Sequence, residues 1–184
     1  VINERYANLR KNIVILNQEN QGLPIARKTG IEHASGEHIL FADPDDWLEQ
    51  NAFDTILKTI KESNADIVYF NLVKREKEYT VSSKELWIEN IFNYKSFGYC
   101  VTKCFRRTLY TENHIYTPIL GMHEDIYLMA QIIYHAKSIV HIPQVLYHYR
   151  KTNKGSMCSQ SMATRHIASS RNLLNLYQNY MDNI

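Results

Sequence analysis

Three aspartates stand within four residues of one another in the segment Asp43-Pro44-Asp45-Asp46, directly after the apolar run of residues 38–42. Carboxylates this close repel one another unless a cation or several hydrogen-bond donors lie between them. Mg²⁺ and Mn²⁺ suit such oxygen ligands, because they take one or two protein carboxylates and leave other positions to substrate phosphates. Helix capping by Asp45 or Asp46 is the alternative, and the spacing does not decide between the two.

A second acidic pair, Glu124 and Asp125, follows His123 at the start of an apolar pattern typical of a helix. A carboxylate held over a reacting hydroxyl can take its proton, an effect worth about 10²–10⁴ in rate. Acidic side chains in the first turn of a helix are also stabilised by the helix dipole, which requires no catalysis. From the residues alone the dipole explanation is favoured, and His123 by itself indicates no catalytic role.

A third group of polar side chains lies in residues 146–156. Arg150 could bind a phosphate through two parallel hydrogen bonds, and the turn that contains Ser156 could offer backbone amides to an anion. His148 is a candidate metal ligand. An edge strand with outward polar groups explains the same pattern, and for His148 it is the simpler explanation.

The first half of the chain alternates between strand-like and helix-like patterns. Short apolar runs rich in β-branched residues predict buried strands at residues 12–16, 38–42 and 66–73. Apolar positions at helical spacing predict a helix from about residue 23 to 36 and another around residues 53–60. This order is typical of an α/β fold with a mainly parallel sheet and helices on its faces. Ligands bind at the carboxyl ends of the strands in such a sheet, where the three aspartates lie.

The second half of the chain continues the alternation less regularly. Residues 98–105 predict a strand, residues 124–136 a helix, and residues 138–142 and 145–150 two short strands separated by Pro143. Two further helices are predicted at residues 85–92 and from about residue 161 onward.

Bulk properties narrow the range of partners and compartments. A formal net charge of +2 on 184 residues argues against a nucleic-acid partner. Lys103, Arg106 and Arg107 do form a basic cluster, for which a solvated face is the usual explanation. Three cysteines without a CxxC pair indicate free, mostly buried thiols and a cytoplasmic location. No signal peptide or apolar run of membrane-spanning length is visible.

Two consecutive segments carry a resemblance to a known family. NQGLPIARKTG at residues 20–30 is similar to the NxGlsxARNxG segment of inverting family 2 glycosyltransferases of the GT-A type, and ASGEHILFADPDDWL at residues 34–48 resembles their a-x-GeyixflDsDDwl. The downstream matches are looser: KCFRR at residues 103–107, the Glu-Asp pair, and the Tyr-Arg and Ser near residues 149–156. The resemblance implies a GT-A (Rossmann-like) fold whose mixed, mainly parallel sheet is flanked by helices.

The resemblance also implies roles for individual residues. Asp43 and Asp45 match the positions that hold a divalent metal, Mg²⁺ or Mn²⁺, and the nucleotide-sugar donor. Asp125, next to Glu124, matches the catalytic base. Arg27 matches a position near the donor site, and Arg150 and Ser156 match further donor-binding positions.

One part of the family pattern has no counterpart in this sequence. Family members begin with a strand, a helix and a second strand that ends in an acidic, nucleotide-binding segment. By resemblance, residues 1–12 correspond to the helix after that segment, so the amino-terminal strands are missing. We therefore expect a piece of a longer polypeptide, with a partial GT-A domain at residues 1–150 and a helical extension at residues 151–184.

The function implied by the resemblance is transfer of a sugar from a nucleotide diphosphate to an acceptor hydroxyl, with inversion, in polysaccharide or glycolipid synthesis. A lipid-linked acceptor would bring the protein to the inner face of the membrane, and a homo-oligomer is compatible with the sequence. A non-catalytic remnant that binds glycans or sugar nucleotides is the alternative. A nucleotidyltransferase is disfavoured because no glycine-rich phosphate loop is visible, and a two-carboxylate glycoside hydrolase requires two carboxyl groups about 5–10 Å apart across a sugar cleft.

Overall fold

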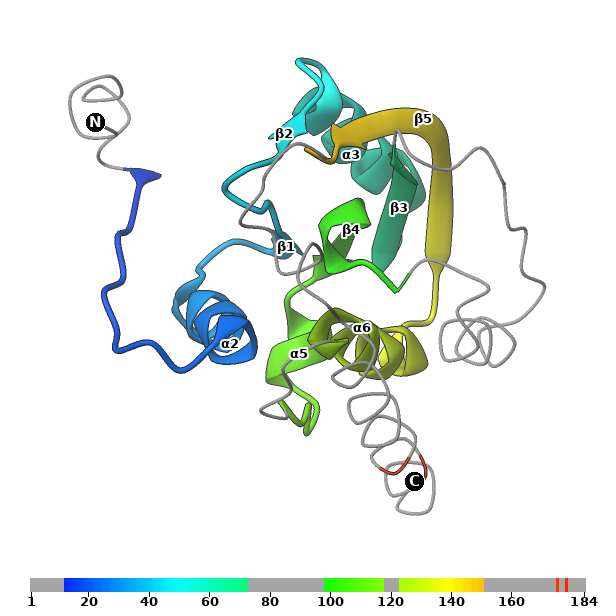
Figure 1. Ribbon diagram of the computed structural model, residues 1–184. Coiled ribbons are helices and arrows are strands. Elements are labelled where there is room, and N and C mark those ends of the chain that lie inside the picture. The colour runs from blue at the N-terminus through cyan, green and yellow to red at the C-terminus, as the bar shows by residue number, and fades with distance from the viewer. Residues whose placement is uncertain (1–11, 73–97, 118–122, 151–174, 176–177, 179–184) are drawn as a thin grey trace.

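A computed structural model describes residues 12–72, 98–117 and 123–150, together with the isolated positions 175 and 178. The described strands form one five-stranded sheet in the order β1-β4-β3-β5-β2 (Figure 1). The strands are β1 His38–Leu40, β2 Trp47–Leu48, β3 Ile67–Leu72, β4 Lys103–Arg106 and β5 Ile139–His148.

The sheet is mixed, as predicted, because it contains both parallel and antiparallel pairs of strands. β1 and β3 both run antiparallel to β4, which lies between them, and β3 pairs in parallel with β5. The strands β1, β3 and β5 therefore share one direction, as expected for strands joined by crossovers. Three of the four hydrogen-bonded pairings described are nevertheless antiparallel, because β4 inserts between β1 and β3 and β2 adds antiparallel to β5. Periodicity within a strand does not reveal such an insertion.

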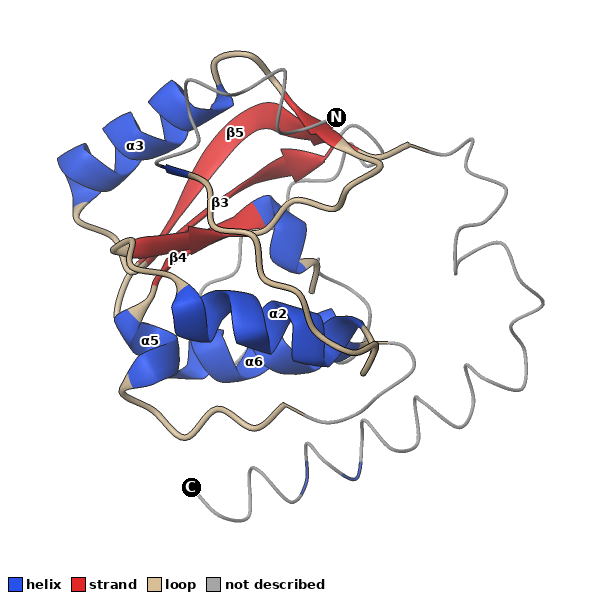
Figure 2. Cartoon of the chain, turned by 90° about the vertical axis from the view of Figure 1, so that its left-hand side faces the viewer, coloured by secondary structure: helices blue, strands red, loops and turns tan. Residues whose placement is uncertain are grey.

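Helices cover both faces of this sheet. Figure 2 shows α3 on one side and α2, α5 and α6 together on the other. The helices are α2 Leu23–His33, α3 Ala52–Ser63, α5 Thr108–Thr111 and α6 Glu124–His135, with a short 3₁₀ turn η2 at Cys100–Thr102.

The core forms where α6 packs against the sheet. Met129, Ile132 and Ile133 are fully buried on α6, and Ile67 and Phe105 are fully buried on the sheet. Burial of such side chains stabilises the fold by about 1.5–3 kcal/mol each. The first turn of α6, with its acidic pair, is thus fixed to the sheet by the turns that follow it.

The predicted strand at residues 12–16 is wrong. These residues form no strand, and Val14 and Ile15 are 75% and 59% exposed. A strand exists only where a neighbour supplies its ladder of hydrogen bonds, and the part of the structure that is described offers none here. Apolar, β-branched composition alone was an insufficient signal.

The two strands predicted around Pro143 form one strand, β5. Phe70 pairs with Ile142 and Asn71 with Val145, so Pro143 and Gln144 are looped out of the register as a bulge. A proline in a bulge removes no ladder hydrogen bond, and the strand can therefore continue through it.

Other predicted elements have mixed outcomes. The strand predicted at residues 98–105 is confirmed only at its end, since the 3₁₀ turn η2 comes before β4. The helix predicted at residues 85–92 and the candidate Ser156 lie outside the described residues. Of the helix predicted from residue 161, and of the extension at residues 151–184, only positions 175 and 178 are described, and both are helical.

Asp66, just before β3, joins three strands. One carboxylate oxygen accepts hydrogen bonds from the backbone N–H groups of Lys137 and Ser138 at 2.8 and 3.3 Å, before β5 begins. The other accepts from Nε of Arg106 at the end of β4, at 3.3 Å.

We expect Asp66→Ala to lower the free energy of unfolding by about 1–2 kcal/mol, because the variant leaves charged and backbone donors without their acceptor. Urea denaturation followed by circular dichroism measures the change. Glu62→Ala is the control, since Glu62 is exposed and lies 3.9 Å from Lys58, and it should change stability by less than about 0.5 kcal/mol. Equal effects of the two substitutions would contradict the role given to Asp66.

Candidate functional site

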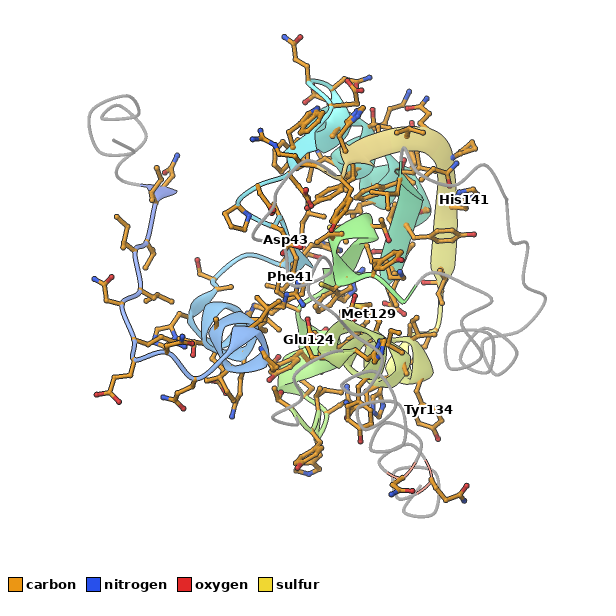
Figure 3. The ribbon with its side chains drawn as sticks, in the orientation of Figure 1. Phe41, Asp43, Glu124, Met129, Tyr134 and His141 are labelled. Atoms are coloured by element: carbon orange, nitrogen blue, oxygen red, sulfur yellow. The ribbon has the colours of Figure 1, made fainter. Side chains whose placement is uncertain are left out.

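Arg27 joins the two acidic segments that the sequence singles out. Its Nη1 donates to Oε1 of Glu124 at 2.6 Å, and its Nη2 donates to Oδ1 of Asp43 at 3.1 Å. The Arg27 side chain is 10% exposed and also lies over the ring of Phe41. In Figure 3, Phe41, Asp43 and Glu124 lie together beside α2. Asp43 and Glu124, which lie 16 and 97 positions after Arg27 in the sequence, are thus brought into one site.

The position of Arg27 follows from how α2 begins. Gly22 precedes the helix with a φ of 86°, a left-handed conformation that glycine adopts without strain. Pro24 occupies the first turn, where the missing N–H costs no hydrogen bond. Ile31 is buried one turn beyond Arg27 and fixes the same face of the helix against the core.

A buried tyrosine holds the turn of aspartates in shape. The Tyr147 hydroxyl donates to Oδ2 of Asp46 at 2.8 Å and accepts from the backbone N–H of Asp43 at 3.1 Å. The backbone N–H of Arg150 donates to the other Asp46 oxygen at 2.9 Å. Both oxygens of Asp46 are therefore engaged within the protein, and Asp43 and Asp45 remain the two aspartates that match the family's metal-binding positions.

The capping explanation for these aspartates is wrong. The residue that precedes the first turn of α3 is Asn51, and no side chain makes a capping hydrogen bond there. Asp45 and Asp46 lie well before that turn, on the far side of β2.

Two carboxylates in one turn fit the needs of a magnesium or manganese ion. Asp43 is one-third exposed and Asp45 is partly exposed, so a ligand can approach both. Such ions take one or two protein carboxylates and complete their shell with water and phosphate oxygens. Within the described ranges no group of three or more His, Cys, Asp or Glu side chains is placed so that it could hold a metal ion by itself.

Asp125 lies next to this turn, in the first turn of α6. One of its carboxylate oxygens accepts the N–H of Ile126 at 2.8 Å. Burial and the neighbouring charge of Glu124 raise the pKa of Asp125 to about 6, against the opposing effect of Arg27. A carboxyl group with this pKa is mostly ionised at neutral pH and can still accept a proton, which suits a general base. The helix dipole acts on the same residue, and neither effect excludes the other.

The other candidates lie on the opposite flank of the turn. His148 hydrogen bonds to Glu49 and stacks on Trp47 with ring centroids 5.1 Å apart, so its contacts are those of a strand residue. The Arg150 guanidinium lies 6.0 Å from the centre of the Trp47 ring. The backbone N–H of Arg150 binds Asp46 and so brings Arg150 to the acidic turn, whereas the His148 ring is bound to Glu49.

A pocket opens beside the Arg27–Glu124 ion pair. Its lining includes Tyr110, Tyr116 and Leu128 as well as Arg27 and Glu124 themselves. Tyrosine rings offer an apolar face and a polar edge, which suits contact with sugars.

Sequence reasoning missed two residues that support this site. Tyr147 is 0% exposed, and its place beside the acidic turn could not be read from the 101 residues that separate it from Asp46. Lys103 was attributed to a solvated basic face, which is wrong: it is 1% exposed, and its neighbour Arg106 is engaged by Glu37 and Asp66. The match of Lys103 to a family motif was the available signal.

We expect Tyr147→Phe to lower the free energy of unfolding by about 1–3 kcal/mol, because the N–H of Asp43 and a carboxylate oxygen of Asp46 lose a buried partner. Thermal and urea unfolding measure the effect. The control is Tyr116→Phe, at a residue that is 55% exposed, which should be close to neutral. A neutral Tyr147→Phe would show that the hydroxyl does not hold the turn.

Comparisons with known proteins agree with this geometry. The family model described as glycosyl transferase family 2 matches residues 1–123. EpsH of Bacillus subtilis, a glycosyltransferase by name, is 30% identical over 164 residues, which cover 81% of this chain and 47% of EpsH. The minor teichoic acid biosynthesis protein GgaB of the same species is 26% identical, over 98% of this chain and 21% of GgaB.

A solved structure supports the fold. The crystal structure of Staphylococcus aureus TarS 1-349 in complex with UDP-GlcNAc is 19% identical and superposes with a TM-score of 0.65 over 87% of this chain and 48% of the TarS chain. The predicted GT-A fold is thereby confirmed. The chain spans about half, or less, of the length of the relatives it matches. No helix in the described part of the chain is long and apolar enough to cross a membrane. The family match and the fold together show that this chain belongs to glycosyltransferase family 2.

Proposed function

We propose that the whole protein is an inverting, metal-dependent glycosyltransferase that moves a sugar from a nucleotide diphosphate to an acceptor hydroxyl in polysaccharide or glycolipid synthesis. The ion pairs of Arg27 with Asp43 and Glu124 carry this proposal. They bring the turn suited to a metal–diphosphate and the helix that carries Asp125 to one site. Membership of family 2, and the complex of TarS with UDP-GlcNAc, support a nucleotide-sugar donor.

Asp43 and Asp45 would hold the divalent metal ion together with the donor diphosphate. When bound, such an ion offsets the negative charge that grows on the departing nucleoside diphosphate. Arg27 keeps its positive charge: burial alone would lower the pKa of the guanidinium, but Cys100, Glu124, Asp43 and Asp125 together raise it. It therefore fixes the orientation of Asp43 before the donor binds. Arg150 and Ser156 are proposed to contact the donor, and His148 is retained as a candidate metal ligand.

Asp125 would act as the general base. Its carboxylate takes the proton of the acceptor hydroxyl while the oxygen attacks the anomeric carbon and the bond to the diphosphate breaks. Attack from the face opposite the leaving group inverts the configuration, so no covalent sugar–enzyme intermediate is needed. Glu124 is bound to Arg27, and we therefore assign it a positioning role beside the base.

The acceptor is proposed to be a glycan or a lipid-linked sugar. The tyrosine-lined pocket beside Glu124 suits such a molecule, and the name of GgaB places that relative in teichoic acid synthesis. A lipid-linked acceptor would bring the protein to the cytoplasmic face of the membrane. A homo-oligomer is equally compatible with this role.

We expect Asp45→Ala to abolish metal-dependent binding of UDP-sugars, because the variant removes one of two carboxylates available to the ion. Isothermal titration of the full-length protein with UDP-sugars, with and without Mn²⁺, measures it. Asp54→Ala is the control, because Asp54 lies in the first turn of α3 outside the site. If Mn²⁺ strengthens donor binding equally in Asp45→Ala and wild type, the metal site is misplaced.

We expect Asp125→Asn to leave donor affinity near normal and to lower turnover by about 10² or more, because the amide cannot accept the proton. In the wild type kcat/KM should rise with pH through about 6, as the base loses its proton, and this acidic limb should be absent from residual activity of the variant. Release of UDP and transfer to acceptor are measured separately. Unchanged turnover in Asp125→Asn would exclude Asp125 as the base. Absence of both UDP release and transfer from the wild type would instead favour the non-catalytic alternative.

A further inference from the structure

We propose that residues 98–103 form a support for Asp125, in which Gly98 permits close approach of α6 and the buried Lys103 ammonium provides a compensating charge. Both are positioning residues: they act on the reaction through Asp125. The inference rests on the proposed function, since it presumes that Asp125 is the base.

The approach of Gly98 to α6 leaves no room for a side chain. A Cβ added at Gly98 would lie 2.6 Å from Cγ1 and 3.2 Å from Cα of Ile126. Contacts that short do not occur, so a larger residue must displace the first turn of α6 or the segment that contacts it. Ile126 directly follows Asp125 and donates its N–H to the Asp125 carboxylate, so a shift of Ile126 moves the base.

Lys103 is an ammonium group inside the protein. Its Nζ donates to the backbone carbonyl of Tyr99 at 2.8 Å and to Oγ1 of Thr102 at 3.3 Å. Thr102 in turn donates to the same Tyr99 carbonyl, which closes the 3₁₀ turn around the amine. A lysine that is 1% exposed is costly to keep charged unless an anion lies near it. Burial accordingly lowers the pKa of Lys103 to about 8.

Among the described residues, the charged or titratable groups that act on Asp125 are Glu124 of α6, Arg27 of α2, Cys100 of η2 and Lys103 of β4. Burial raises the pKa of the Cys100 thiol far above neutrality, so this group is uncharged. Glu124 repels the Asp125 charge, and Arg27 is already divided between Glu124 and Asp43. Lys103 is a second cation that acts on Asp125, and its charge lowers the pKa of that carboxyl group.

The charge is tested by the pH profile of kcat/KM for Lys103→Met in the full-length protein. Methionine keeps the length and the apolar stem and removes the charge, so the acidic limb should move to higher pH by about one unit. The KM for the donor should change little. Lys58→Met is the control, because Lys58 is 73% exposed on α3 and should leave the profile unchanged.

The steric part is tested by comparing Gly98→Ala with Gly30→Ala. Gly98→Ala should lower kcat by about 10–100-fold, because a small displacement of a reacting group has effects of this size. Gly30→Ala should keep wild-type kcat, since a Cβ at Gly30 meets no atom within 4 Å. Unfolding temperatures of all variants identify any that fail to fold. The lysine pair tests the charge of Lys103, and the glycine pair tests the close approach at Gly98, so each test stands without the other.

The outcomes separate the inference from the function on which it rests. The inference is supported if the acidic limb of the kcat/KM profile shifts in Lys103→Met, or if kcat falls in Gly98→Ala but not in Gly30→Ala. An unshifted limb together with equal kcat in the two alanine variants overturns it, while an inactive Asp125→Asn keeps the proposed base in place. Normal turnover in Asp125→Asn would overturn both.

Discussion

One buried guanidinium holds the candidate site together. Arg27 forms ion pairs with Asp43, which follows β1, and with Glu124, at the start of α6. Two segments far apart in the sequence are therefore held together by one side chain. A charge that is nearly inaccessible to water must be paired, and a guanidinium can pair with two carboxylates in a fixed geometry. The same contacts that satisfy Arg27 place a turn suited to a metal–diphosphate beside a carboxylate suited to accept a proton.

Burial affects the protonation of this site as well as its geometry. The helix that carries Asp125 is anchored by fully buried side chains further along α6, so its first turn is held at the sheet. A carboxylate in that position is expensive to ionise, which raises its pKa towards neutrality, and nearby cations limit the rise. Tyr147 holds the acidic turn itself, because its buried hydroxyl binds both the Asp46 carboxylate and the backbone N–H of Asp43. Structure and chemistry thus depend on the same few buried polar groups.

Local sequence patterns predicted the elements that carry their own signal. The periodicity of α3 and α6 and the apolar run of β3 need no knowledge of neighbours, and each appears close to its predicted bounds. Residues 12–16 and the bulge at Pro143 were misjudged, because strand formation depends on a partner and on register. The meeting of Asp43 with Glu124 came from family resemblance, since no spacing rule connects them. Lys103 was missed because lysine is so seldom buried.

A structure of the full-length protein with a nucleotide sugar and Mn²⁺ tests the proposed site most directly. We expect Asp43 and Asp45 to hold the metal ion beside the donor diphosphate. We also expect the anomeric carbon to face the Asp125 carboxylate on the side opposite the diphosphate. A donor bound away from the turn, or an Asp125 carboxylate on the same side of the sugar as the diphosphate, would contradict it.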